Sequence, residues 1–226
     1  MNICGVIFDL DGTLVYYSVD RNKLRSELLN RLRLHNIPLS SFLRLKSIWS
    51  IIKNFYYIAE SNGLDNGERR RILFELYGII ENYELDAAKK LSLIPGALTA
   101  LKYVRNMGYK SALYTLCGRK PTLKVLERFD LMKFFDAVIT RDDVENVKPH
   151  PEHLLKAISI LNVKPREVVV VGDSVLDAEC AKNIGAIFIG VKTGVRSEAE
   201  LRASGADYIL NSVSELPSLL YLLSSI

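Results

Sequence analysis

The chain has 226 residues, of which 49% are hydrophobic and 25% charged, and its formal net charge is +4. This length favours one large domain or two unequal ones with a sizeable core. The charge is modest and there is no low-complexity tail, so we expect no nucleic-acid partner. No apolar stretch has the length of a membrane span, so we expect no membrane partner either.

The three cysteines, Cys4, Cys117 and Cys180, are widely spaced and odd in number. They form neither a disulfide framework nor a CxxC metal pattern, which favours free thiols in a reducing compartment. The chain runs from Met1 straight into the apolar segment 3–8, without the basic start and cleavage site of a signal peptide. These features predict a cytoplasmic protein.

The first predicted element is a strand over Ile3–Phe8, and an acidic segment follows it directly. Asp9 and Asp11 are two residues apart, so on an extended backbone both carboxylates point to the same side. Gly12 allows the backbone to turn closely around a ligand. We expect Gly12 and the adjacent Thr13 to contribute to substrate binding.

Residues 16–92 contain no convincing strand and read as a helical insert. Their apolar spacing and candidate caps predict four helices. These are Val19–Asn36, a helix that starts at Ser40 or Ser41 and extends past Phe55, Glu68–Tyr77, and Tyr83–Leu91.

The insert carries the whole net charge of the chain. Residues 16–92 hold 13 Lys/Arg and 9 Asp/Glu, whereas the rest holds 17 of each. An ordinary solvated helix face explains this excess, and a positive lid that attracts an anionic substrate is the alternative. The basic residues that open the insert are Arg21, Lys23, Arg25, Arg31 and Arg33.

After residue 92, short Val/Ile-rich runs alternate with helical patterns, which is typical of a doubly wound (Rossmann-like) α/β fold with a parallel sheet. We therefore predict a core domain over 1–15 and 93–226, with a smaller helical cap domain over 16–92 inserted after the first strand. The expected strands are Ser111–Tyr114, Ala137–Ile139, Val168–Val171, Ala186–Val191 and Tyr208–Leu210, and the expected helices are Gly96–Met107, Pro121–Phe129, Pro151–Leu161 and Val175–Ile184.

Several polar residues fall where predicted strands end, and ligands of doubly wound sheets bind at the carboxyl ends of strands. Thr115 offers a hydroxyl to a phosphoryl oxygen, and the backbone N–H of Leu116 offers a second donor. Lys148, followed by Pro149, supplies a compact positive charge.

The acidic residues at these ends suit a hard cation. Clustered carboxylates with a phosphate substrate favour Mg²⁺, and Asp9 and Asp173 are the best direct ligands. A carboxylate also serves as a nucleophile in enzymes that form an aspartyl-phosphate, while a neighbouring acid protonates the leaving oxygen and later activates water. Asp9 and Asp11 have the arrangement for that pair.

The ordered set of motifs resembles the haloacid dehalogenase-like superfamily, in its phosphatase branch related to phosphoglycolate phosphatases and β-phosphoglucomutases. The matching motifs are Asp9-Leu10-Asp11-Gly12-Thr13, Thr115, Lys148-Pro149, and Gly172-Asp173-Ser174 with Asp177. The resemblance covers most of the predicted sheet domain, and the helical insert lies where the family has its mobile cap.

The resemblance implies roles for these residues. Asp9 would attack phosphorus, Asp11 would be the general acid/base with its carbonyl also on Mg²⁺, and Asp173 would be a metal ligand. Thr115 and Lys148 would hold the phosphoryl group. Behind them, Asp177 would support Lys148 or a metal-bound water, and Ser174 would also support the site without direct ligation.

The sequence therefore predicts a Mg²⁺-dependent phosphatase acting on a small phosphorylated metabolite. Phosphoglycolate, a sugar phosphate and a nucleotide monophosphate all remain open as substrates, and the protein is expected to be a monomer or homodimer. One alternative is a phosphosugar mutase of the β-phosphoglucomutase type, which shares every catalytic residue. Another is a non-catalytic protein that senses or binds phosphoryl groups.

Overall fold

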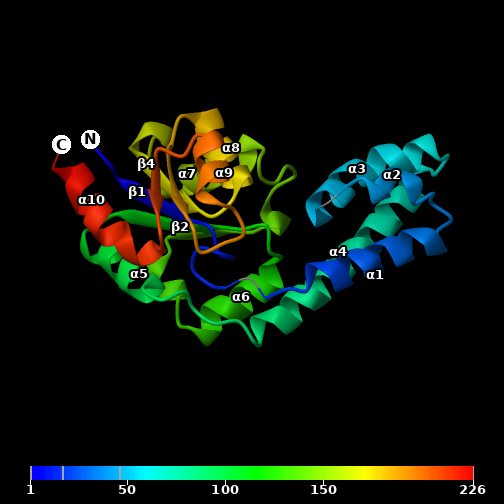
Figure 1. The fold of residues 1–226 in the computed structure, drawn as a ribbon, viewed down its shortest axis with the longest axis horizontal. Coiled ribbons are helices and arrows are strands. Elements are labelled where there is room, and N and C mark those ends of the chain that lie inside the picture. The colour runs from blue at the N-terminus through cyan, green and yellow to red at the C-terminus, as the bar shows by residue number, and fades with distance from the viewer. Residues whose placement is uncertain (1, 17, 46, 226) are drawn as a thin grey trace. The chain divides into compact units, whose positions relative to one another are not determined.

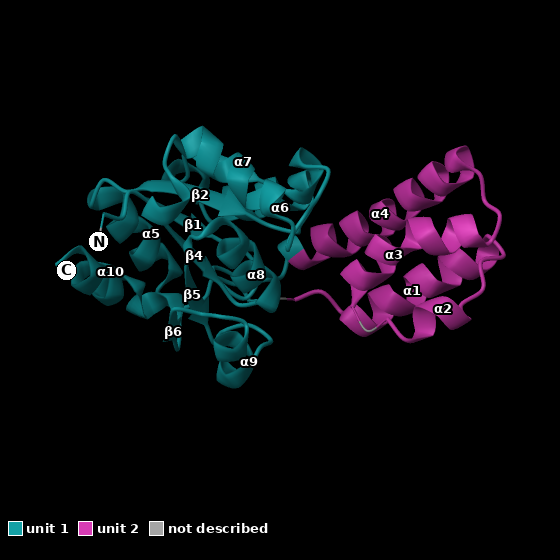
Figure 2. Cartoon of the chain, turned by 90° about the horizontal axis from the view of Figure 1, so that it is seen from above, with its two compact units in different colours: residues 1–17, 88–226 teal, residues 18–87 magenta. Residues whose placement is uncertain are grey.

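The computed structural model describes residues 2–16, 18–45 and 47–225. The chain divides into two compact units, which Figure 2 colours separately. Unit 1 contains Met1–Tyr17 and Ala88–Ile226, and unit 2 contains Ser18–Ala87. The helices among the described residues include none that is both long and apolar enough to cross a membrane.

Unit 1 is built on a sheet of six parallel strands (Figure 1), which confirms the predicted doubly wound α/β class. The spatial order is β3-β2-β1-β4-β5-β6. The strands are β1 (Gly5–Phe8), β2 (Lys110–Tyr114), β3 (Ala137–Ile139), β4 (Val168–Gly172), β5 (Ile187–Val191) and β6 (Tyr208–Leu210).

Helices cover both faces of this sheet because its strands are apolar on both sides. One face, which includes Phe8 and Leu113, packs in a cluster with residues of α5 (Ala97–Asn106), α6 (Arg119–Arg128) and α10 (Leu216–Ser224). The other face, which includes Ile7 and Tyr114, packs with residues of α7 (Pro151–Leu161), α8 (Val175–Ile184) and α9 (Glu198–Ala203). Burial on both faces explains why the strands read as continuous apolar runs.

The register brings the ends of three strands together. Phe8 of β1 pairs with Leu113 of β2 and with Val171 of β4. The chain passes from β1 to β2 and β3 on one side and returns to β4 on the other. Ligands of doubly wound folds bind where the strand order reverses, which is at the carboxyl ends of β1 and β4 in this sheet.

Unit 2 is helical in its described residues, with α1 (Arg21–Leu34), α2 (Ser40–Leu43), α3 (Ile48–Ser61) and α4 (Asn66–Ala88). Two helix predictions are wrong here. The helix expected from Ser40 past Phe55 is two helices, because Ser47 and Ser50 form a capping box that starts α3 afresh. The two helices expected over 68–91 are the single helix α4.

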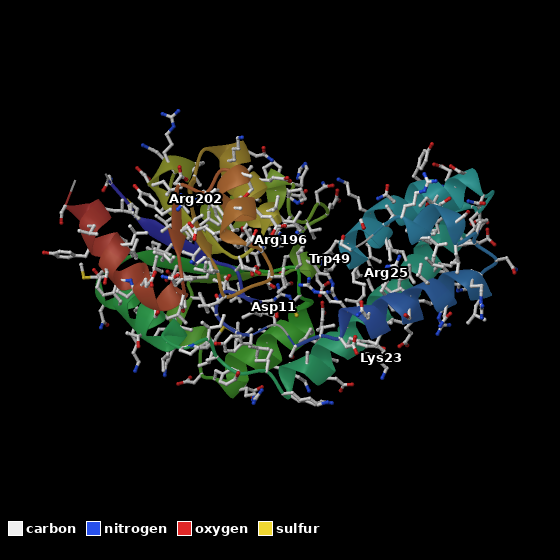
Figure 3. All side chains as sticks on the ribbon, in the orientation of Figure 1. Asp11, Lys23, Arg25, Trp49, Arg196 and Arg202 are labelled. Atoms are coloured by element: carbon white, nitrogen blue, oxygen red, sulfur yellow. The ribbon has the colours of Figure 1, made fainter. Side chains whose placement is uncertain are left out.

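Two of the basic residues at the start of the insert, Arg25 and Arg31, make contacts within unit 2. The guanidinium of Arg25, labelled in Figure 3, donates to the carbonyl oxygens of Leu43 and Leu45 at 3.3 and 3.2 Å, next to the end of α2. Arg31 lies 3.6 Å from the Glu75 carboxylate. These two side chains therefore stabilise unit 2 itself, which favours the helix-face interpretation over a positive lid.

Candidate active site

The centre of the site is a buried lysine between two buried aspartates. The Lys148 ammonium donates to Asp9 Oδ1 at 2.6 Å and to Asp177 Oδ1 at 2.7 Å. Their side chains are exposed by 2%, 9% and 1% respectively. Since little water reaches these charges, they interact more strongly than surface ion pairs do, and each would be costly to bury alone.

Two further side chains hold Lys148. Its ammonium lies 3.5 Å from the centre of the Tyr114 ring, and the Tyr114 hydroxyl donates to Asp177 Oδ1 at 2.7 Å. The backbone N–H of Lys148 donates to Nδ1 of His153 at 3.4 Å. Burial, with the Lys148 charge, lowers the pKa of His153 to about 4, so this imidazole is neutral. Lys148 is thus enclosed by a carboxylate on two sides and an aromatic face on a third.

Asp177 has two structural tasks that its sequence position explains. It is the third residue of α8, and with Ser174 it forms a capping box in which the Ser174 hydroxyl and N–H donate to Oδ2 at 2.6 and 3.2 Å. Its other oxygen accepts from Lys148 and Tyr114. Burial raises the pKa of Asp177, but Lys148 and the hydrogen bonds outweigh it and keep the pKa below its ordinary value.

The acidic groups of the site suit a cation. Carboxylate oxygens of Asp9, Asp173 and Asp177 all lie within 4.8 Å of one another. Burial, opposed by Lys148 and aided by Asp177 and Asp173, raises the pKa of Asp9 to about 8. Burial and the Asp177 charge raise that of Asp173 to about 7. A divalent cation would relieve this repulsion.

Asp9 and Asp173 are the residues of this cluster that fit direct ligation. The oxygens of Asp177 already accept four hydrogen bonds, two at each atom. Asp173 is instead held by one backbone donor, since Val195 N–H points to its Oδ2 at 3.2 Å. The donor set therefore fits a hard divalent metal bound by Asp9 and Asp173, with Asp177 behind them.

Glycines leave the space that the Asp173 carboxylate occupies. A Cβ on Gly194 would lie 1.6 Å from Asp173 Oδ2, and one on Gly12 would lie 2.5 Å from the same atom. Gly12 also has a φ of +79°, which disfavours other residues. The Thr193 hydroxyl donates to the Gly12 carbonyl at 2.6 Å and ties the two loops together.

The remaining predicted residues lie around this centre. Asp11 is half-buried in the turn after β1 (labelled in Figure 3), and its charge contributes to the raised pKa of Asp173. Thr13 is fully buried, and its hydroxyl has no hydrogen-bond partner among the described residues. Thr115 is buried just after β2, and Leu116 is half-buried beside it.

Sequence reasoning missed Tyr114, His153 and Thr193 as residues of the site. Tyr114 looks like an ordinary strand residue, and only the alternation of side chains along β2 shows that it faces α7 and α8 rather than the opposite layer. His153 falls five residues after Lys148, which was the one available signal. His150 is exposed and caps α7 by accepting from the Glu152 N–H at 3.2 Å.

Comparisons with known proteins identify the family of this chain. The model of the haloacid dehalogenase-like hydrolase family matches residues 6–191. A protein named pyrophosphatase PpaX from Bacillus cereus is 30% identical over 96% of this chain and 95% of its own length. Another of that name, from Bacillus mycoides, is 39% identical, but the match spans only 50% of this chain and 53% of that protein.

Solved structures show the same fold. A HAD phosphatase from Thermococcus onnurineus is 30% identical, with a TM-score of 0.61 over 96% of this chain and 98% of its own. A hydrolase from Pseudomonas syringae has a TM-score of 0.68 at 24% identity, covering 98% of both chains, and supports the fold alone. The chain belongs to the haloacid dehalogenase-like hydrolase family.

Proposed function

We propose that the protein is a Mg²⁺-dependent phosphohydrolase that acts on a small phosphorylated compound through an aspartyl-phosphate at Asp9. The observation that carries this proposal is the buried array of Asp9, Lys148 and Asp177 beside Asp173 at the carboxyl ends of β1 and β4. A phosphoryl group bound there would meet a nucleophile, a fixed cation and a metal-binding carboxylate at once.

In the first proposed step, an oxygen of Asp9 attacks phosphorus and the bond from phosphorus to the leaving oxygen breaks. Lys148 stays protonated through this step, because Asp177 and Asp9 outweigh its burial and hold its pKa above the ordinary value. Bound Mg²⁺ would neutralise charge on the phosphoryl oxygens. Asp11 donates its proton to the leaving oxygen, so the product leaves as an alcohol or as protonated phosphate.

In the second step, water attacks the phosphorus of the acyl phosphate and gives its proton to the Asp11 carboxylate. The bond between Asp9 and phosphorus breaks, and inorganic phosphate and free Asp9 result. Thr115 and Leu116 N–H are the donors expected to hold the phosphoryl oxygens in both steps. Asp11 therefore donates a proton in the first step and accepts one in the second.

The first test is hydrolysis of p-nitrophenyl phosphate by wild type and Asp9→Asn, each with Mg²⁺ and with EDTA. We expect metal-dependent turnover in wild type and a loss of at least about a thousandfold in Asp9→Asn, because the amide is not a nucleophile. Full activity in Asp9→Asn would contradict the mechanism. Turnover that survives EDTA would contradict the role of the metal.

Pyrophosphate is a specific substrate candidate, because relatives aligned over almost their whole length are named pyrophosphatases. It should be compared with phosphoglycolate, a sugar phosphate and a nucleoside monophosphate at equal concentration. A higher kcat/KM for pyrophosphate would assign the substrate. Isomerised sugar phosphate without released phosphate would instead support the mutase alternative.

A further inference from the structure

A buried arginine outside the predicted set of site residues contacts the loop that follows β2. Arg141 comes just after β3, and only 5% of its surface is exposed. Its guanidinium Nη1 donates to the carbonyl oxygen of Leu116 at 3.1 Å. Its backbone N–H points to the carbonyl oxygen of Cys117 at 3.4 Å. Both contacts fall on the segment expected to hold the phosphoryl group.

These contacts fix one peptide unit at both ends. The Leu116–Cys117 peptide has its carbonyl held by Arg141, and its N–H, on Cys117, donates to Thr115 Oγ1 at 3.1 Å. A hydroxyl oxygen that accepts from this N–H directs its own proton elsewhere. Thr115 is therefore left as a donor, in the role that a phosphoryl oxygen requires.

The neighbours of Arg141 hold the same loop from the same side. The Asp142 carboxylate accepts from the Arg119 backbone N–H at 2.7 Å, and the Asp143 carboxylate pairs with the Arg119 guanidinium. Asp143 in turn accepts from the hydroxyl of the buried Thr140 at 2.7 Å. The turn 140–143 thus holds the loop 116–119 at its carbonyls, at a backbone N–H and at one side chain.

An arginine suits this position for two physical reasons. Its guanidinium is planar and permanently charged, so it fixes the direction of a hydrogen bond better than a flexible ammonium does. A hydrogen bond from a charged donor is also about twice as strong as a neutral one. Arg141 Nε also lies 3.5 Å from the Asp142 carboxylate, so the charge is paired within the turn and acts on the loop through the hydrogen bond to Leu116.

We propose that Arg141 is a positioning residue for phosphoryl binding, which acts by fixing the Leu116–Cys117 peptide and thereby the donor direction of Thr115. This inference rests on the proposed function of the site. It adds a residue from the turn after β3 to a mechanism whose other groups follow β1, β2 and β4 or lie before α7. Its effect should appear in phosphate binding and should depend on the Thr115 hydroxyl.

The test compares Arg141→Met and Arg141→Lys with wild type and a matched control, Arg105→Met. Arg105 is exposed and also donates from its guanidinium to a backbone carbonyl, that of Lys133, so the control loses the same kind of bond elsewhere in unit 1. The readouts are kcat and KM for p-nitrophenyl phosphate, and the dissociation constant of inorganic phosphate by calorimetry in the presence of Mg²⁺.

Arg141→Met should weaken phosphate binding and lower kcat/KM by about tenfold to a hundredfold, as loss of a charged hydrogen bond would. Arg141→Lys should recover part of this, and Arg105→Met should match wild type. In a Thr115→Val background, the Arg141→Met change should have less than about a third of its effect, because the group it positions is already absent.

The inference would be overturned if folded Arg141→Met bound phosphate as tightly as wild type does. It would also be overturned if Arg141→Met had the same effect on phosphate binding in the wild-type and Thr115→Val backgrounds. If Arg141→Met does not fold, the same comparisons apply to Arg141→Lys. Should wild type bind phosphate but not turn over any substrate, the proposed function fails while the binding comparison still decides the role of Arg141. Absence of phosphate binding in wild type would contradict both.

Discussion

Lys148 neutralises part of the negative charge of the site, because its ammonium pairs with two aspartates. Two carboxylates and the face of an aromatic ring surround its ammonium, and little of it meets water. Such a buried group depends on well-placed partners, since removing one leaves the others unpaired. Tyr114 matters here because it contacts both Lys148 and Asp177.

Tyr114→Phe should lower kcat/KM by about tenfold, because Asp177 loses one donor while the ring beneath Lys148 remains. Tyr103→Phe is the matched control, since the buried Tyr103 hydroxyl has no hydrogen-bond partner among the described residues. Steady-state kinetics on both variants provide the comparison. Equal kinetics in the two variants would show that the Tyr114 hydroxyl does not position the site.

Three motif residues could be predicted because each directly follows a strand that apolar runs identify, namely Asp9, Thr115 and Asp173. Tyr114 and Arg141 could not, because their roles depend on contacts between segments far apart in the chain. The Tyr114 hydroxyl reaches Asp177, 63 positions away, and Arg141 reaches Leu116, 25 positions away. A single sequence does not contain those pairings.

At the scale of elements, the structure indicates a role for the loop after β5 that the sequence did not predict. Thr193, Gly194 and Val195 lie against Asp173 and Gly12 through one backbone N–H, one hydroxyl and the absence of a Cβ. The loop sets the position of the Asp173 carboxylate. A substitution in this loop is therefore expected to change metal binding, which is measured separately from the stability of the metal-free protein.

We expect Mg²⁺ to raise the melting temperature of wild type, and Gly194→Ala should abolish most of this rise. A Cβ at this position would overlap the Asp173 carboxylate, so this proposed metal ligand must move. At a hundred times its Kd a metal stabilises by about 2.7 kcal/mol, or about 5–10 °C for a chain of this size. Thermal unfolding with and without Mg²⁺ measures this.

Gly78→Ala is the control for that substitution, because nothing lies within 4 Å of a Cβ there and Gly78 is inside α4. It should keep the full response to Mg²⁺ and gain up to about 1 kcal/mol of stability from better helix propensity. An unchanged Mg²⁺ response in Gly194→Ala would show that this loop does not set the metal site.

The sequence predicted the strands within about two residues, since buried Val/Ile runs and Gly/Pro breaks agree there. In the helical insert it predicted α1 within two residues but misplaced the bounds of the later helices. The gap expected after Tyr77 is bridged by α4, in which Ile79 and Ile80 follow Gly78 directly and are buried. Tertiary packing outweighs the modest cost of a helical glycine.

In the whole molecule, the doubly wound unit 1 holds every proposed catalytic residue, and the helical unit 2 holds none of them. The proposed phosphoryl chemistry therefore requires residues of unit 1 alone. This division explains why motifs in a single chain predict the reaction class, while the substrate needs the comparison of compounds described above.

The most direct measurement is mass spectrometry of Asp11→Asn quenched in acid during turnover of p-nitrophenyl phosphate. Nitrophenolate leaves without a proton, so Asp9 can be phosphorylated in this variant, whereas hydrolysis of the acyl phosphate lacks its base. We predict a phosphoryl group on the peptide that contains Asp9. Nitrophenol release with no phosphoryl group on that peptide, or with one on another residue, would contradict the account.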